Sequence, residues 1–234
     1  MLRQRRLVPE LMDDPGLDVD RHHTALAGLR RINYFSRSVS VLWSAICAER
    51  TRLNNRPLRI LDVACGGGDT VFSIARRAKQ SGVELTIDGC DISEQALRYA
   101  HQNPANVNPR QHKFIQADVI ADDVPEGYDI VMSSLFLHHL TEQDAVILLK
   151  NMASKCEHCV LVDDLRRTLS GYMLAWAGCR LLSRSKIVHF DGPQSVRAAF
   201  TPSEVLRLTE QACMRPIELK RHWPQRFLLR WGKT

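Results

Sequence analysis

Long apolar runs, internal repeats and a disulfide framework are all missing from this sequence. No apolar run reaches the roughly 18 to 20 residues that a helix needs to cross a bilayer. The basic residues near the N-terminus are not followed by an apolar segment of signal-peptide length. The seven cysteines are odd in number and scattered, unlike those of a disulfide-stabilised secreted domain. We therefore expect a cytoplasmic protein without a transmembrane segment.

The composition excludes little else. The 234 residues are 44% hydrophobic and 25% charged, as in ordinary globular proteins, and suffice for one domain with an accessory segment. The formal net charge is +6, with basic residues gathered at both ends of the chain. Such a mildly basic balance is compatible with RNA, with anionic lipid or with no charged partner at all. No basic stripe interleaved with aromatic residues points to RNA.

A glycine-rich loop follows an apolar run that carries Asp62. Three consecutive glycines, Gly66–Gly68, allow a tight turn and a close approach of the backbone to a ligand. The sixth position from Gly66 is Val71, so the dinucleotide pattern G-x-G-x-x-G is missing, as is the Lys-Ser/Thr pair of a P-loop. Asp62 and Asp69 place negative charge on either side of the loop, which favours a cationic ligand over a pyrophosphate.

Strands and helices alternate from Leu58 to Asp164, which is typical of a parallel sheet with helices on both faces. The second strand ends at Asp91, 23 positions after Gly68, where an acid can accept hydrogen bonds from ribose hydroxyls. The third strand is followed by Asp118. Right-handed crossovers place the first and fourth strands side by side, so that their carboxyl ends face one crevice. A helical region over about 20–50 precedes the sheet.

The motif D-x-A-x-G-x-G from Asp62 to Gly68 resembles the first motif of class I S-adenosylmethionine (SAM)-dependent methyltransferases, usually D/E-x-G-x-G-x-G. Ala64 replaces the first glycine. The resemblance implies a Rossmann-like, mostly parallel seven-stranded α/β sheet, closed by an antiparallel hairpin over 216–220 and 226–231. It also implies S-adenosyl-L-methionine as the cofactor. The cofactor-binding residues that it implies are Asp62, Ala64, Cys65, Gly66, Gly68, Asp91, Ile92, Ala117, Asp118, Val119, Ser133 and Leu135.

Three of the acidic residues also have simpler interpretations when each is taken alone. Asp91 could cap a helix, since Ser93 and Glu94 follow it. Asp118 could be an exposed turn residue. Asp129, at the start of the fourth strand, could only bond nearby backbone. The joint placement of Asp91 and Asp118 favours cofactor contacts for these two, whereas Asp129 is interpreted as structural.

Two segments outside the sheet are expected to cover the site. We divide the chain into an N-terminal helical cap (1–55) and a SAM-binding domain (56–234) with a lid-like insertion (165–200). The insertion ends before a predicted helix start at 201–204. Its apolar stretch Leu169–Leu182 needs an apolar partner. Packing against the N-terminal helices and lining an acceptor pocket both stay open, and a closed lid would exclude water. The N-terminal apolar positions with helical spacing are Leu26, Leu29, Ile32, Phe35, Val39 and Leu42.

Three histidines are candidates for assisting the chemistry. Methyl transfer from a sulfonium is an in-line displacement, so the enzyme mainly positions the acceptor, but a phenol must also lose a proton. His138 and His139 follow the fourth strand, where adjacent histidines are not expected to share one orientation; His138 could instead be structural. His189 lies beside Asp191–Pro193, a sequence typical of a loop. Asp163–Asp164, at the end of strand five, could orient a base, contact substrate or cap a helix.

The sequence therefore predicts a SAM-dependent methyltransferase that acts on an oxygen or carbon of an aromatic or lipophilic small molecule. Residues 9–15, 162–167 and 189–197 resemble methyltransferases related to quinone and phenolic-lipid methylases. An RNA methyltransferase is the alternative, although the Asn/Asp-Pro-Pro-Tyr/Phe element of the amino-methylating base enzymes is missing after strand four. A non-catalytic SAM-fold binding protein is a third. The C-x-x-C of 156–159 is interpreted as the start of strand five, and no metal site is expected. The acceptor and a homodimer stay open.

Overall fold

The computed structural model describes residues 2, 4–13, 17–18, 24–25, 28, 31–32, 38–103, 112–121 and 124–233. Seven strands form one sheet in the order β3-β2-β1-β4-β5-β7-β6. The first five strands along the chain run parallel, and β7 is antiparallel to both β5 and β6. This confirms the predicted sheet, its closing hairpin and the neighbouring first and fourth strands. The strands are β1 (Leu58–Val63), β2 (Leu85–Asp91), β3 (Phe114–Gln116), β4 (Tyr128–Ser134), β5 (Cys156–Leu165), β6 (Ile217–His222) and β7 (Arg226–Gly232).

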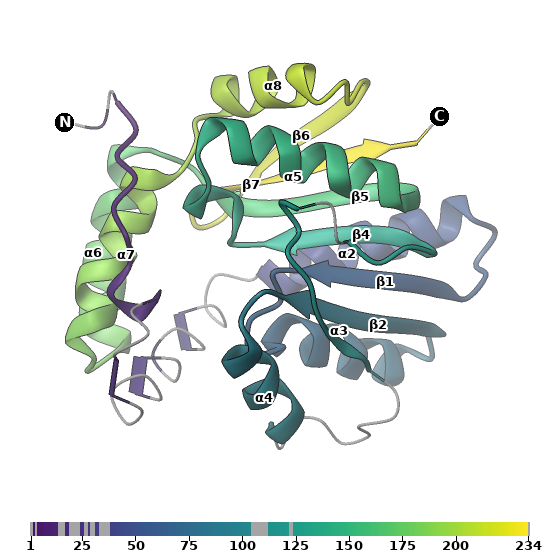
Figure 1. Cartoon of the computed structure of the whole chain (residues 1–234), viewed down its shortest axis with the longest axis horizontal. Helices are drawn as coiled ribbons and strands as arrows, with labels where there is room; N and C mark the ends of the chain where they lie inside the picture. Colours follow the sequence, from purple (N-terminus) through teal and green to yellow (C-terminus); the bar gives the residue numbers. More distant parts are fainter. Residues whose placement is uncertain are drawn as a thin grey trace.

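Helices cover both faces of the sheet, and two further helices stand beyond one edge of it (Figure 1). Helices lie between β1 and β2, between β2 and β3 and between β4 and β5 as predicted, but the described residues between β3 and β4 contain a turn and no helix, so the predicted alternation fails there. The helix α8 begins at the predicted helix start, where Thr201 and Glu204 form a capping box. The helices are η1 (Leu11–Asp13), α2 (Ser38–Arg52), α3 (Asp69–Ser81), α4 (Glu94–Gln102), η2 (Leu137–His139), α5 (Glu142–Lys155), α6 (Leu169–Leu182), α7 (Lys186–Ala198) and α8 (Pro202–Gln211).

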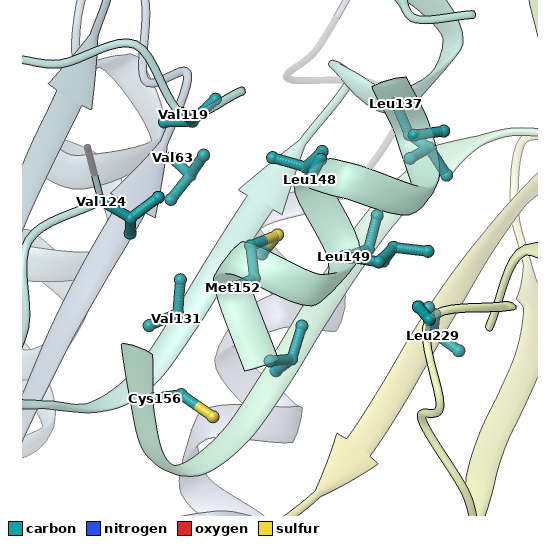
Figure 2. Packing of buried hydrophobic residues seen from close by; sticks show 14 of the residues in the cluster. Val63, Val119, Val124, Val131, Leu137, Leu148, Leu149, Met152, Cys156 and Leu229 are labelled. Atoms are coloured by element: carbon teal, nitrogen blue, oxygen red, sulfur yellow. The ribbon is translucent and has the colours of Figure 1, made fainter. Parts of the chain in front are cut away.

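Alternation of side chains along the strands divides the core into two layers. Val63 and Val131 point to the face that α5 and α8 cover, where they meet Leu148 and Leu149 of α5 (Figure 2). Their neighbours in the strands, such as Ile60, point to the other face, toward α2 and α3. Because both faces are covered, the central strands are almost continuously apolar, and the acids at their ends stand out.

The carboxyl ends of β1, β2, β4 and β5 meet at one edge of the sheet, hereafter the carboxyl edge. The glycine-rich loop follows β1 here, and η2 follows β4. In Figure 1, α6 and α7 stand opposite this edge at the left, together with the purple N-terminal segment. Segments that are remote in sequence therefore gather where the parallel strands end, the usual ligand position in sheets of this type.

The insertion is a pair of helices, and this corrects one prediction. The sequence Asp191–Pro193, interpreted as a loop, lies within α7. Packing explains the difference: the Asp191 carboxylate accepts hydrogen bonds from the backbone N–H of Leu11 and Met12, at 2.9 and 3.1 Å. A Cβ on Gly192 would lie 2.3 Å from the sulfur of Cys179 in α6, so glycine permits the close approach of the two helices. Tertiary contacts thus override a local turn preference.

The N-terminal region is described only in part. Leu26, Leu29 and Phe35 lie outside the described residues, so their predicted helical positions stay predictions. Ala25 is fully buried and packs in one cluster with Cys179, Ile187 and Val188 of the α6–α7 pair, with Met12, Leu17 and Ile32 against them. Packing between the N-terminal region and the insertion is therefore present. None of the helices in the described part of the chain combines the length and the apolar character needed to cross a membrane.

Candidate active site

The glycine-rich loop joins β1 to α3 through a series of left-handed residues. Ala64, Gly66 and Gly68 have φ values of +56°, +53° and +78°. A Cβ added to Gly66 would meet nothing within 4 Å, whereas one on Gly68 would lie 2.9 Å from the rings of Phe72 and Phe114. Gly66 thus borders open space, and Gly68 permits close packing behind the loop.

Asp91, at the tip of β2, ties this loop in place. The N–H of Gly66 donates to Asp91 Oδ2 at 2.8 Å, and the N–H of Ser93 donates to Oδ1 at 2.9 Å. The N-cap of α4 is Ser93, whose side chain accepts from Ala96. The simple interpretation of Asp91 as the cap is therefore wrong. The carboxylate stands beside the open space at Gly66, where a ligand hydroxyl could donate to it.

Asp62 lies near the end of β1 and is almost completely buried. Burial, together with the negative charge of Asp91, raises the pKa of Asp62 to about 8. Its carboxyl is therefore mostly protonated at neutral pH. A cation bound beside it would favour the carboxylate form, which makes the end of β1 a receptive place for an ammonium or sulfonium group.

The remaining predicted cofactor residues fall into two groups. Ile92 is 63% exposed. Ala117 and Val119 belong to the core, so only the backbone of these two residues could line a pocket. Asp118 Oδ1 accepts from the N–H groups of Ile120 and Ala121 at 2.9 and 3.3 Å, which is the bonding of a turn residue.

Cys65, Ser133 and Leu135 lie at the carboxyl ends of β1 and β4. The sulfur of Cys65 packs where a Cβ on Gly89 would lie, and burial raises the pKa of this thiol strongly. Leu135 has φ +57° and donates its N–H to the carbonyl of Asp163 at 2.8 Å. Asp129, by contrast, accepts from the N–H of Arg59 at 2.7 Å at the start of β4, which confirms its structural interpretation.

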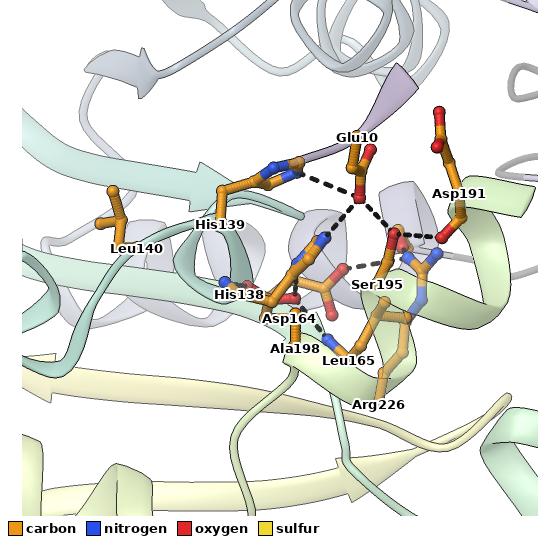
Figure 3. A network of polar contacts seen from close by, with 12 residues as sticks. Glu10, His138, His139, Leu140, Asp164, Leu165, Asp191, Ser195, Ala198 and Arg226 are labelled. Atoms are coloured by element: carbon orange, nitrogen blue, oxygen red, sulfur yellow. Dashed lines mark hydrogen bonds and ion pairs between the residues drawn. The ribbon is translucent and has the colours of Figure 1, made fainter. Parts of the chain in front are cut away.

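His138 and His139 lie in η2, directly after β4. Their ring centroids are 4.3 Å apart and their planes differ by 35°, so the rings lie side by side (Figure 3). The expectation that adjacent histidines would diverge is wrong. The tight turn that begins at Leu135, with its left-handed backbone, and the capture of the His138 ring by a partner in β5 bring the two rings together.

That partner is Asp164. Its carboxylate accepts from the backbone N–H of His138 at 3.0 Å and lies 2.6 Å from Nδ1 of the same ring. Burial by itself would lower the pKa of His138, but the charge of Asp164 and this hydrogen bond raise it above its ordinary value. The same pairing lowers the pKa of Asp164 despite its burial. Burial, reinforced by the neighbouring positive charge of His138, lowers the pKa of His139 to about 4.

Glu10 completes this group, and the sequence did not single it out as a site residue. Its Oε1 lies 3.9 Å from Nε2 of His138 and 3.9 Å from Nε2 of His139 (Figure 3). The hydroxyl of Ser195 in α7 donates to the same oxygen. We call Glu10, His138, His139 and Asp164 the histidine cluster. The one sequence signal for Glu10 is that it lies in the segment 9–15, which resembles other methyltransferases.

Residues 4–13, hereafter the N-terminal strap, carry Glu10 across the carboxyl edge. Arg5 donates to the backbone carbonyl of His138 at 2.8 Å and its guanidinium lies 3.8 Å above the ring of Phe200. The N–H of Arg6 donates to the carbonyl of Arg197 at 3.1 Å. With the bonds to Asp191, these contacts hold the strap against η2 and α7.

His189 does not join the histidine cluster. Its Nε2 lies 2.8 Å from the carbonyl of Ser183, in the connection between α6 and α7. Asp163, next to Asp164 in β5, points to the opposite face of the sheet, 2.6 Å from Nε2 of His222 and 3.5 Å from Nη1 of Arg226. Strand alternation thus assigns the two neighbouring acids to separate polar groups.

In sequence, the chain is similar to known methyltransferases. Residues 60–158 match a family described as a methyltransferase domain. A ubiquinone biosynthesis O-methyltransferase of Idiomarina loihiensis is 26% identical over 165 residues, which are 69% of this chain and 63% of that protein. One of Pseudomonas fluorescens is 28% identical over 135 residues, covering 57% of this chain and 55% of that protein. The chain thus spans less than two thirds of the length of these relatives.

Solved structures show the same fold. The magnesium protoporphyrin IX methyltransferase of Synechocystis with bound SAM aligns over 96% of this chain and 88% of that one, with a TM-score of 0.57 and 14% identity. The SAM-dependent methyltransferase SibL, in its apo form, aligns over 97% of this chain and 63% of that one, with a TM-score of 0.68 and 17% identity. Both alignments span nearly the whole of this chain.

Proposed function

We propose that this chain, whose residues 60–158 match a family described as a methyltransferase domain, is an enzyme that transfers a methyl group from SAM to a small molecule. One observation carries the proposal: the bond from Gly66 to Asp91 and the buried Asp62 gather at the same edge as the histidine cluster. One half of this edge suits a cationic nucleoside, and the other can act on an acceptor. The activity of the matched O-methyltransferases supports the same assignment.

Four of the predicted cofactor residues have specific roles in this proposal. Asp91 accepts hydrogen bonds from the ribose hydroxyls, and the backbone at Gly66 approaches the nucleoside closely. Asp62 faces the positively charged methionine part of SAM. Asp118, after β3, is proposed to meet the adenine.

The acceptor atom is proposed to be a hydroxyl oxygen of an aromatic or lipophilic molecule. In the transfer, the oxygen attacks the methyl carbon in line with the sulfonium sulfur, the carbon–sulfur bond breaks, and S-adenosylhomocysteine leaves. The hydroxyl proton must depart, and the histidine cluster is the polar group placed to promote this. Glu10 and His139 have partly exposed side chains, 15% and 28%, so they can contact an acceptor.

The cap (1–55) and the insertion (165–200) are proposed to form an apolar cover over the acceptor. The strap and the buried cluster around Ala25 join them. Leu169, Met173 and Trp176 of α6 remain 66%, 56% and 45% exposed, so this helix has apolar surface to offer. Limited proteolysis should cut the α6–α7 connection in the free enzyme and cut it more slowly with SAM and a proven acceptor bound. Unchanged cleavage would remove the lid from the proposal. A cytoplasmic location is also proposed, from the sequence alone.

Calorimetric titration with SAM tests the cofactor half of the proposal. Asp91→Ala and Gly66→Val should each weaken SAM binding strongly, the first by removing the ribose partner and the second by filling the open space at the loop. Glu157→Gln, which alters an exposed acid at the start of β5, should bind SAM like the wild type. Binding of NADH without any response to SAM would overturn the proposal.

Isotope-labelled SAM with host lysate tests the acceptor half. The label should enter a small lipophilic molecule and not RNA. Glu10→Gln and His139→Gln should lower turnover about 10²- to 10⁴-fold while SAM affinity stays nearly intact. Labelled RNA would favour the alternative function, and normal turnover in both variants would exclude the histidine cluster from the chemistry.

A further inference from the structure

We propose that Glu10, His138 and His139 bind one divalent transition-metal ion of the zinc class, although the sequence analysis expects no metal site. The three side chains offer two imidazole nitrogens and one carboxylate oxygen, and these donor atoms all lie within 4.8 Å of one another. Among the described residues, they are the one group of three or more His, Cys, Asp or Glu side chains with this property.

The distances are those of a site that needs only a small closure. Zinc binds imidazole nitrogen and carboxylate oxygen at about 2.0 to 2.2 Å, so tetrahedral ligand atoms stand about 3.4 Å apart. Glu10 Oε1 lies 3.9 Å from each Nε2. Each of these distances exceeds the tetrahedral separation by about half an ångström, and all three donor atoms lie within 4.8 Å of one another, so the three side chains must draw together around the ion.

The outer contacts hold the ligands in the required form. Nδ1 of His138 is engaged by Asp164 at 2.6 Å, which leaves Nε2 of the same ring directed at Glu10. A carboxylate behind a metal-binding histidine is the usual arrangement, because it fixes the tautomer and the ring direction. The hydroxyl of Ser195 donates to Oε1 of Glu10, the same oxygen that faces both Nε2 atoms, and so fixes the direction of the Glu10 side chain. The carbonyls of the η2 turn are held by Arg5.

The donor set selects the metal. Two imidazoles and one carboxylate favour Zn²⁺, Co²⁺ or Ni²⁺ over Mg²⁺ and Ca²⁺, which prefer all-oxygen sites. Three protein ligands leave the fourth position open, as in catalytic zinc sites. The exposed part of His139 gives solvent access to that position.

The open position explains how the histidine cluster could promote loss of a hydroxyl proton, and this part rests on the proposed function. An imidazole, with an ordinary pKa near 6.5, is a weak base for a phenol whose pKa is near 10. A bound ion instead lowers the pKa of the hydroxyl that occupies its open position, so the proton can pass to solvent before the oxygen attacks the methyl group. The ion is neither oxidised nor reduced, and it stays in the site.

The test measures metal binding without SAM or acceptor. Untagged full-length protein, freed of metal with a chelator and dialysed, is titrated with Co²⁺ under visible absorption and with Zn²⁺ by calorimetry. One equivalent should bind, the cobalt spectrum should be that of a four- or five-coordinate ion, and excess Mg²⁺ should not displace it. Asp164→Asn should weaken binding about 10- to 100-fold. Glu10→Gln and His139→Ala should weaken it further.

His158→Gln serves as the matched control, since it removes a partly exposed histidine at the opposite edge of the sheet. It should bind the ion like the wild type. Failure of the wild type to take up one equivalent, or equal uptake by Glu10→Gln, His139→Ala and His158→Gln, would overturn the proposal. If no ion binds while Glu10→Gln still lowers turnover, the metal site is refuted and the proposed methyl transfer stands.

Discussion

The buried Asp62 allows a quantitative prediction about stability. The ordinary pKa of the side chain is 3.8, and burial, with the charge of Asp91, raises it to about 8 in the folded chain. The folded state therefore holds a proton that the unfolded chain releases above pH 3.8. Because the pKa of Asp62 is higher in the folded chain than in the unfolded chain, the contribution of this carboxyl to the free energy of unfolding is fully present below pH 3.8. That contribution is lost as the pH rises to about 8.

The size of the effect follows from these two values. Each pKa unit corresponds to about 1.4 kcal/mol, so the wild type should lose ~2.6 kcal/mol of unfolding free energy between pH 5 and pH 7 through this one group. In the Asp62→Asn variant, the side chain at this position has no proton to lose between pH 5 and pH 7. Relative to the wild type, the variant should thus become more stable by that amount over the same interval, with little further change above pH 8.

Urea unfolding of the cofactor-free proteins at pH 5, 6 and 7 measures the difference, and the exposed Asp69→Asn provides the control. Asp62→Asn should also bind SAM more weakly, because the carboxylate that would face the cation is gone. A stability difference between wild type and Asp62→Asn that does not change with pH would refute the reasoning, since it would mean that the buried carboxyl is already ionised.

Three further substitutions test the loop and one helix cap. Ala64→Gly should stabilise the protein by about 0.5 to 1 kcal/mol in urea unfolding, because φ +56° strains alanine; a loss of stability would contradict this. Gly68→Ala should destabilise it by ~1 to 3 kcal/mol, since the new Cβ meets the ring of Phe114 and φ is +78°; an unchanged midpoint would show that the loop can shift. Thr201→Ala should cost about 1 kcal/mol by removing the cap of α8, and no change would mean that Glu204 suffices.

Strand periodicity and spacing were enough to predict the sheet. The apolar runs that end in Asp62 and Asp91, with helical stretches between them, require parallel strands with covered faces, and handedness then places β1 beside β4. The glycine loop and its acidic neighbours follow from the same local pattern, because these residues lie within one strand–helix–strand unit. Local chemistry also predicted the start of α8 and the strand role of Cys156 and Cys159.

Only the tertiary structure decided the histidine cluster. Glu10 is remote in sequence from His138 and His139, and no local pattern measures the distance between their side chains. Neighbouring side chains of a strand point to opposite faces of the sheet, so only one of the two acids in β5 can hold His138. That it is Asp164 becomes known only when the partners on each face are in place. The loop predicted at Asp191–Pro193 became a helix for the same reason: the strap supplies hydrogen bonds to it from the far end of the chain, and a sequence pattern contains no information about a partner that folding alone brings near.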